Sequence, residues 1–315
     1  MTLVMPSVYS HSCRLMGNNF GFSVVAEDEQ WANTCIEKAI DEVKRIEKLL
    51  TTYDENSQTN LINKNAGIKA VEVDLEVFDL IERSLKISVL TQGAFDITYG
   101  SLDRRFWNFD KDMTGLPDPA VAKRMVRLIN YKNVILNRTD QTVYLKEQGM
   151  LIGFGGIGKG YAADRAKQVI IGAGVKDGIV NAAGDLTVWG TQPNGKAWTI
   201  GIADPDRKHL PFASLKLSDI SVATSGNYEK FAIIGGVKYS HTIDPKTGYP
   251  VRGIKSVTII CSSAELSDAL ATPVTVMGIK AGLGLINQMK HVACIVIDDN
   301  DDIYTSNNIN LKLDL

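Results

Sequence analysis

The chain has little of several features that would each point to a particular class of protein. Its 315 residues contain only four cysteines, at Cys13, Cys35, Cys261 and Cys294, with no C-x-x-C spacing. Cysteines scattered in this way are typical of reduced thiols rather than of a disulfide framework or a zinc site. The formal net charge is only −2, which argues against general nucleic-acid binding. No apolar run approaches the ~20 residues that a membrane-spanning helix needs.

The N-terminus also lacks the features of an export signal. Residues 1–6 read Met-Thr-Leu-Val-Met-Pro, without a basic region or a long apolar core. Cys13 follows Ser-His-Ser, which is a poor lipoprotein cleavage site. We therefore expect a cytoplasmic protein with no membrane insertion.

Apolar periodicity and turn residues indicate a mixture of helices and strands. Helices are predicted at 27–50, 74–90 with Asp74 as N-cap, 161–171 and 263–277. An opening strand is predicted at 14–25 with a kink at Met16, and a polar loop at 54–67. Further strands are predicted at 133–136, 142–145, 178–181, 185–189, 197–202, 221–224, 231–234, 256–260 and 293–297. Because helices and strands do not alternate strictly, the predicted class is α+β, as a single domain spanning residues 1–315.

The most informative feature that is present is a glycine-dense run at residues 151–164, which follows an apolar stretch and opens into a helical pattern. Glycine lets a backbone come close to a ligand, and a helix start offers unpaired N–H groups to an anion. The run matches a dinucleotide fingerprint at Gly153-x-Gly155-x-x-Gly158, and a P-loop except that Gly160 replaces the Ser or Thr that binds Mg²⁺. No acidic residue ends the next strand and no βαβ rhythm follows, so neither reading fits. A tight strand-to-helix turn whose glycines serve only packing remains an alternative.

Three other places carry candidate chemistry. Asp268 and Thr272 are four residues apart on a helical pattern, so their oxygens share one face and suit Mg²⁺, unless this is simply a solvated face. His241 precedes a turn and has the pKa range of a general base, although a structural histidine is an equal alternative. Asp96 lies in a Gly-Ala-Phe-Asp segment that could hold the polar edge of a heterocycle, with aromatics such as Trp107 covering its face.

Together, these pieces resemble the ApbE-type FAD:protein FMN transferases along nearly the whole chain. Any one motif is modest, but their shared order and spacing make the resemblance specific. It rests on Met16-Gly17, Asp54-x-x-Ser57 to Asn63, Gly93 to Thr98, Gly155 to Asp164, Gly184-Asp185-Leu186, Ala223 to Gly226, Ser240 to Gly248, and Asp268-Ala269-x-Ala271-Thr272.

The resemblance implies an ApbE-like, T-fold-like architecture with antiparallel-rich sheets and flanking helices. It also implies that FAD is the substrate and Mg²⁺ the metal, and that FMN passes to a Thr or Ser hydroxyl of an acceptor protein as AMP leaves. The expected metal ligands are the Asp268 carboxylate, the Thr272 hydroxyl and the Gly156 carbonyl, with His241 as the base. The expected flavin contacts are Met16, Ala94, Phe95, Asp96, Lys159 and Ile243.

One residue departs from the family pattern. The family usually has an aspartate that contacts the flavin nucleotide where this chain has Gly153. Two other functions stay open at this point. An Mg²⁺-dependent FAD pyrophosphatase would use water in place of the acceptor hydroxyl, and a non-catalytic FAD-binding protein would need neither metal nor base.

Overall fold

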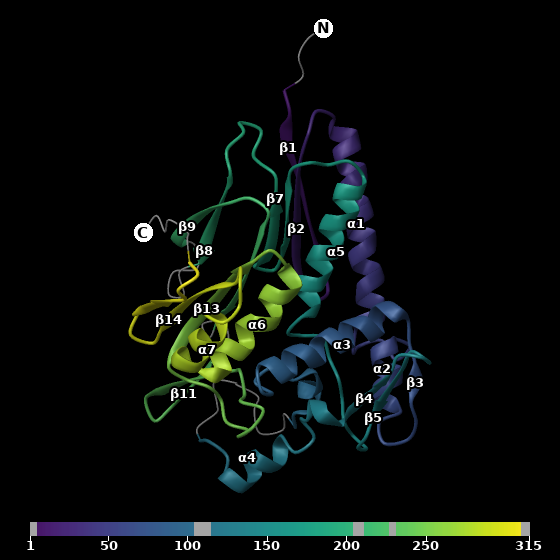
Figure 1. Ribbon diagram of the computed structural model, residues 1–315, viewed down its shortest axis with the longest axis vertical. Helices are drawn as coiled ribbons and strands as arrows, with labels where there is room; N and C mark the ends of the chain where they lie inside the picture. The colour runs from purple at the N-terminus through teal and green to yellow at the C-terminus, as the bar shows by residue number, and fades with distance from the viewer. Residues whose placement is uncertain (1–4, 104–114, 204–210, 227–230, 310–315) are drawn as a thin grey trace.

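The computed structural model describes residues 5–103, 115–203, 211–226 and 231–309 (Figure 1). Trp107, which the sequence suggested as an aromatic cover, lies outside these ranges. None of the described helices is long and apolar enough to cross a membrane.

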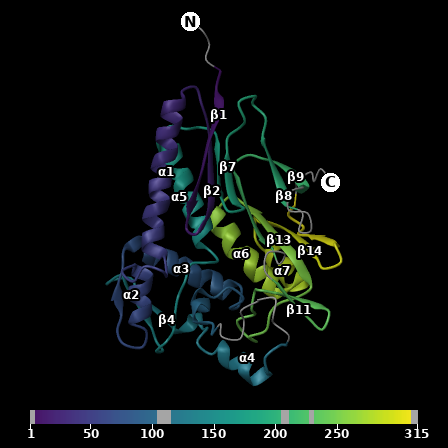
Figure 2. The same ribbon diagram turned by 180° about the vertical axis from the view of Figure 1, so that it is seen from behind.

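An eight-stranded sheet forms the centre of the molecule, and every neighbouring pair of its strands is antiparallel. Figure 2 shows the same sheet from behind. In spatial order the strands are β1 (Ser7–Leu15), β2 (Asn18–Ala26), β6 (Gly178–Ala182), β7 (Asp185–Trp189), β10 (Ile220–Gly226), β13 (Ile254–Cys261), β14 (Ala293–Asp298) and β15 (Ile303–Thr305).

Smaller sheets and seven α-helices surround this sheet in the described part of the chain. The small sheets pair β3 (Val71–Glu72), β5 (Thr142–Leu145) and β4 (Val134–Asn137), then β8 (Trp198–Ala203) with β9 (Pro211–Leu217), and β11 (Phe231–Ile234) with β12 (Val237–Ser240). The α-helices are α1 (Glu29–Leu50), α2 (Gln58–Lys64), α3 (Leu75–Leu90), α4 (Pro119–Met125), α5 (Gly158–Gly172), α6 (Ala264–Met277) and α7 (Ile279–Ile286). The described residues also form two 3₁₀ helices, η1 (Ile97–Ser101) and η3 (Tyr131–Asn133).

The two faces of the central sheet are covered differently. Helices α1 and α5 pack on the β1, β2 and β6 end, and α6 with α7 packs on β13 and β14 (Figure 1). The β8–β9 hairpin covers the other face, where Trp198 and Leu215 belong to the same hydrophobic cluster as Leu186 and Val188 of β7. Successive side chains of a strand point to opposite faces, so Asp185 and Thr187 of β7 point toward the helices.

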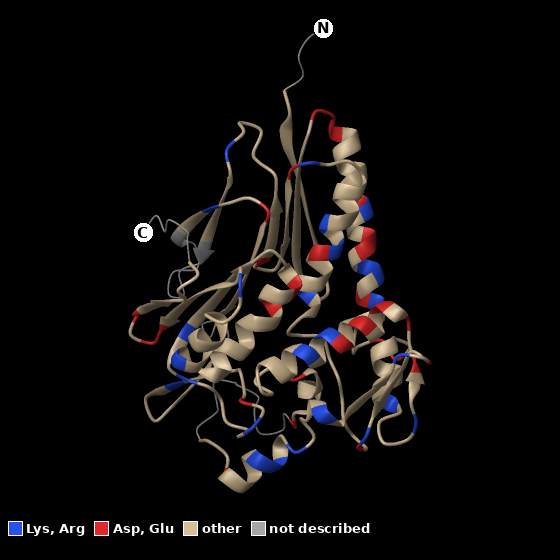
Figure 3. Cartoon of the chain, viewed as in Figure 1, with Lys and Arg blue, Asp and Glu red and all other residues tan. Residues whose placement is uncertain are grey.

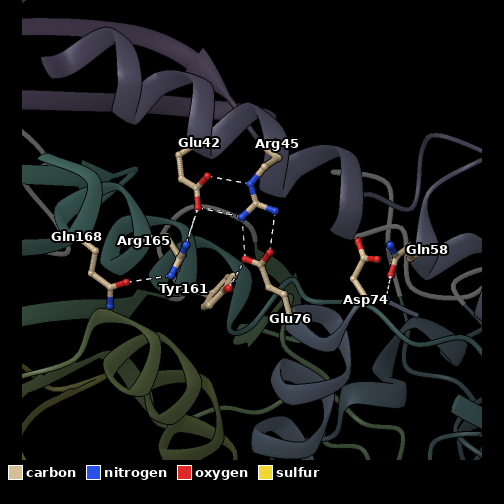
Figure 4. A network of polar contacts seen from close by, with 8 residues as sticks. All are labelled: Glu42, Arg45, Gln58, Asp74, Glu76, Tyr161, Arg165 and Gln168. Atoms are coloured by element: carbon tan, nitrogen blue, oxygen red, sulfur yellow. Dashed lines mark hydrogen bonds and ion pairs between the residues drawn. The ribbon is translucent and has the colours of Figure 1, made fainter. Parts of the chain in front are cut away.

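A network of charged side chains joins α1, α3 and α5 beside the core (Figure 3 and Figure 4). Arg45 Nη1 lies 2.7 Å from Glu76 Oε2, and Arg45 Nε lies 2.8 Å from Glu42 Oε2. Arg165 Nη2 lies 3.1 Å from the same Glu42, and the Tyr161 hydroxyl donates to Glu76. Hydrogen bonds from Arg45 lower the pKa of both Glu42 and Glu76, which favours their charged forms. The network fixes the orientation of α5, whose first turn carries Lys159.

The α+β class predicted from the sequence is confirmed, and several elements fall where they were predicted. Strands at 185–189 and 231–234 match, and the helix predicted at 263–277 begins one residue later. The single strand predicted at 14–25 is wrong. Met16 and Gly17 have φ angles of 51° and 74°, which produce a hairpin turn between β1 and β2 rather than a kink.

The loop predicted at 54–67 is also wrong, because it contains α2. Ser57 starts this helix by accepting a hydrogen bond from the Asn60 N–H at 3.1 Å. The polar composition of the segment masked a short helix that buries only Thr59, Ile62 and Asn63.

Candidate functional site

A cavity of about 1010 Å³ opens where the glycine run meets four other segments. Its volume lies near the upper end of the range typical of small-molecule sites, roughly 300–1,000 Å³. The β1–β2 turn, residues 47–63, residues 94–102 and the segment around His241 supply much of its lining. All the predicted site residues except Asp268 line it: Met16, Ala94, Phe95, Asp96, Gly156, Lys159, His241, Ile243 and Thr272.

The glycine run forms the wall of this cavity and then enters α5. A Cβ on Gly160 would lie 2.1 Å from the Ala264 carbonyl oxygen and 2.8 Å from Asp268 Cβ, so no larger residue fits between α5 and α6. The Gly160 N–H donates to Asp268 Oδ2 at 3.0 Å. Close packing of the two helices therefore explains why glycine stands where a P-loop would have Ser or Thr.

Asp164 holds the start of α6 against α5. Its carboxylate accepts hydrogen bonds from the Ser263 hydroxyl at 2.8 Å, the Ala264 N–H at 3.0 Å and the Glu265 N–H at 3.0 Å. A carboxylate at a helix N-terminus satisfies unpaired N–H groups and complements the helix dipole. This cap fixes the helix that carries Asp268 and, one turn later, Thr272.

Lys159 lies between two buried carboxylates from different elements. Its Nζ is 2.5 Å from Asp185 Oδ2 and 3.2 Å from Asp268 Oδ1. Burial opposes the charge on Lys159, but Asp268 and Asp185 together raise the pKa of its ammonium above the ordinary value. Burial and the nearby Asp268 raise the pKa of Asp185 to about 7, against the opposing effect of Lys159. The two carboxylates thus form a site that already attracts one cation.

His241 follows β12, lines the cavity and is exposed to solvent. The backbone on its C-terminal side is fixed: the Thr242 N–H donates to Ser240 Oγ at 3.0 Å, and the Ile243 N–H donates to the Tyr99 hydroxyl at 3.0 Å. The turn after it packs against α4, because an added Cβ on Gly248 would lie 2.2 Å from the Ala122 carbonyl oxygen of that helix. The Tyr249 hydroxyl also donates to the Pro117 carbonyl, just before α4, at 3.0 Å. The imidazole is therefore carried by a well-supported loop.

Protein groups already hydrogen-bond to the Asp96 carboxylate at the cavity wall. Its carboxylate accepts from the Thr98 N–H at 2.8 Å, the Thr98 hydroxyl at 2.6 Å and the Tyr131 N–H at 2.9 Å. Burial raises its pKa, and these hydrogen bonds act in the opposite direction. With three protein donors, the carboxylate shapes the 94–102 segment, and the Phe95 ring lies against the Gly156 backbone. Its predicted contact with flavin is untested and stays a prediction.

The oxygen donors that line the cavity, together with Asp268 beside it, fit a hard divalent cation. No group of three or more His, Cys, Asp or Glu side chains gathers for a metal within the described residues. The Asp268 carboxylate, the Thr272 hydroxyl and the Gly156 carbonyl are instead a mixed oxygen set, which is the kind that Mg²⁺ accepts. The ammonium of Lys159 beside Asp268 shows that positive charge is stabilised there.

Comparison with known proteins agrees with this arrangement. A family model described as the ApbE family matches residues 16–296. This chain belongs to the ApbE family. An FAD:protein FMN transferase of Klebsiella pneumoniae is 32% identical over 302 residues, which cover 95% of this chain and 92% of that protein. Another ApbE relative, an FAD:protein FMN transferase of Treponema pallidum, is 29% identical over 280 residues, covering 84% and 77% respectively.

Solved structures of ApbE proteins share the fold. The crystal structure of the ApbE protein from Thermotoga maritima has a TM-score of 0.85 and 31% identity, covering 96% of this chain and 97% of that one. The flavin transferase ApbE from Vibrio cholerae has a TM-score of 0.84 at 22% identity, with 96% and 98% covered, and shows the same fold.

Sequence reasoning gave Asp185 no role, although it lies in one of the motifs on which the resemblance rests. The structure places it closer to Lys159 than Asp268 is. The available signal was a Gly-Asp pair at a predicted strand start, which is too common to single out without the fold.

Proposed function

We propose that this protein transfers FMN from FAD to a Ser or Thr hydroxyl of an acceptor protein and releases AMP. The observation that carries the proposal is that one cavity is lined by the exposed His241, by Thr272 and by Gly156. Asp268 lies directly beside this lining, because its carboxylate contacts Lys159 and accepts a hydrogen bond from the Gly160 N–H. Membership of the ApbE family and the names of the two relatives support the same reaction.

In the proposed reaction, the acceptor hydroxyl oxygen attacks the FMN-side phosphorus of FAD. A new P–O bond forms, the bond between that phosphorus and the AMP oxygen breaks, and AMP leaves. His241 accepts the proton of the hydroxyl. Its exposure supports a protein acceptor, because a loop of another chain must reach it.

Asp268, Thr272 and the Gly156 carbonyl would hold Mg²⁺, and the cavity walls would hold the nucleotide. When bound, the metal would neutralise charge on the phosphate oxygens during the transfer. Met16, Phe95 and Ile243 supply apolar surface for the flavin ring within the same cavity. The extent of residues 1–315 as one domain and the cytoplasmic location stay predictions.

The test uses purified protein with FAD and Mg²⁺, with and without an acceptor protein to which one of the relatives transfers FMN. AMP is measured by chromatography, and flavin on the acceptor by fluorescence in a denaturing gel. Release of AMP only in the mixture that contains the acceptor, together with fluorescence on the acceptor, supports the transferase. AMP without an acceptor would indicate a pyrophosphatase, and no AMP in either mixture would indicate a flavin-binding protein.

A further inference from the structure

The single ammonium group of Lys159 contacts two buried carboxylates beside the cavity. Lys159 is the only Lys or Arg among the described residues that line the cavity. The side chains of Asp185 and Asp268 are only 7% and 8% exposed, so water screens neither carboxylate well. One ammonium therefore serves two buried carboxylates, and one of these is the proposed metal ligand.

A divalent cation and an ammonium compete for the same carboxylate. Two positive charges a few ångströms apart repel strongly where water is excluded. If the Asp268 carboxylate binds a metal, it no longer balances the charge of the Lys159 ammonium. Lys159 then needs a second carboxylate close by. Asp185 is such a counter-ion, and its contact with Nζ, at 2.5 Å, is the shorter of the two.

Local structure holds Asp185 firmly in place. It begins β7 directly after a tight turn in which Ala183 and Gly184 have φ angles of 57° and 102°. The Gly184 N–H donates to Asn181 Oδ1 at 2.8 Å, and the backbone of Thr224 on the neighbouring strand donates to the Asp185 carboxylate. The carboxylate is thus fixed by the sheet, while Lys159 reaches it from α5.

We propose that Asp185 is a positioning residue that retains Lys159 and leaves the Asp268 carboxylate available to a divalent cation. Asp185 itself does not bind the metal. The proposal rests on the part of the proposed function that makes Asp268 a metal ligand, but it does not depend on which acceptor receives FMN.

The experiment measures Mn²⁺ binding to the purified protein by electron paramagnetic resonance, with and without FAD, so that its readout is independent of turnover. In Asp185→Asn, Lys159 has only Asp268 as an anionic partner and competes with the metal. Loss of a group that supports a metal ligand typically weakens metal affinity about 10- to 100-fold, and we expect a loss in that range. Circular dichroism confirms that each variant is folded.

A second variant removes the competitor as well. The Lys159→Met/Asp185→Asn double variant should bind Mn²⁺ within about threefold of wild type, because charge-assisted pairing with Asp268 is gone. If the double variant binds as weakly as Asp185→Asn, Asp185 is itself a ligand or supports the site in another way, and the proposal is wrong.

Glu47→Gln is the matched control, because Glu47 lines the same cavity and the change also removes one negative charge. An equal loss of Mn²⁺ affinity in this control would assign the effect to general electrostatics and overturn the pairing. Wild-type Mn²⁺ affinity in Asp268→Ala would also overturn the proposal, because Asp268 would then not be a ligand. The absence of Mn²⁺ binding to the wild type, with and without FAD, would overturn it as well. If the variants behave as expected but FAD yields no AMP with any acceptor, the transferase function fails while this inference stands.

Discussion

Gly153 lines the candidate cavity, at the position where the resemblance to the ApbE family leads us to expect an aspartate. The structure shows that a side chain can be accommodated there. The φ angle of Gly153 is outside the left-handed region, and the nearest atom to an added Cβ is Thr52 Cγ2 at 3.9 Å. Its N–H already donates to the Ile97 carbonyl at 3.0 Å, and a new side chain leaves that bond intact. Backbone geometry therefore does not require glycine at this position.

We expect Gly153→Asp to tighten FAD binding. A hydrogen bond to a charged group typically contributes about 1.5–3 kcal/mol. Since each 1.4 kcal/mol is about tenfold in affinity, the dissociation constant should fall roughly 10- to 150-fold. Quenching of FAD fluorescence during titration with protein, in the presence of Mg²⁺, measures this constant directly.

Two control variants separate the contact from other effects of filling the space. Gly153→Asn has almost the same shape as aspartate but no charge, so it should gain much less affinity. Gly153→Ala should leave FAD affinity unchanged and raise the free energy of unfolding by about 0.4–1 kcal/mol, because the unfolded chain loses freedom. A folded Gly153→Asp with unchanged or weaker FAD affinity would refute the reasoning, and a destabilised one would contradict the space seen at Gly153.

Three further predictions concern the base, the metal ligand and the helix contact. His241→Ala should slow FMN transfer about 10²- to 10⁴-fold, the usual contribution of a general base, while FAD affinity changes little. Asp268→Ala should abolish AMP release in limiting Mg²⁺, because it removes the only carboxylate of the proposed oxygen set. Its circular dichroism spectrum should be unchanged. Gly160→Ala should destabilise the protein by about 1–3 kcal/mol in urea unfolding, since its Cβ would meet the Ala264 carbonyl oxygen at 2.1 Å.

Each of these has a result that would contradict it. A large rise in the FAD dissociation constant with nearly normal turnover would make His241 a binding residue. Wild-type AMP release by Asp268→Ala in limiting Mg²⁺ would place the metal elsewhere. A Gly160→Ala variant as stable as Gly172→Ala, where an added Cβ meets nothing within 4 Å, would show that α5 and α6 separate without cost.

The elements that the sequence predicted well are those whose pattern is local and strong. The helix over α1 could be read from its apolar periodicity, and the strand over β7 from its composition. The β1–β2 turn and α2 were missed, because a non-glycine residue with positive φ at Met16 and a short polar helix carry almost no periodic signal.

In the candidate site, too, some features follow from the sequence and others only from the tertiary structure. Ordered motifs along the chain determined the family resemblance, the α+β class and the residues proposed for metal, flavin and base, because those motifs keep their residue types and spacing in sequence. Only the tertiary structure decided that Lys159 lies between Asp185 and Asp268, which are 26 and 109 positions away in the chain. It also decided that Asp164 caps α6 and that three protein donors surround the Asp96 carboxylate. Periodicity reports whether a residue is buried and on which face, whereas the partner of a buried charge depends on which strands pair and how closely two helices pack.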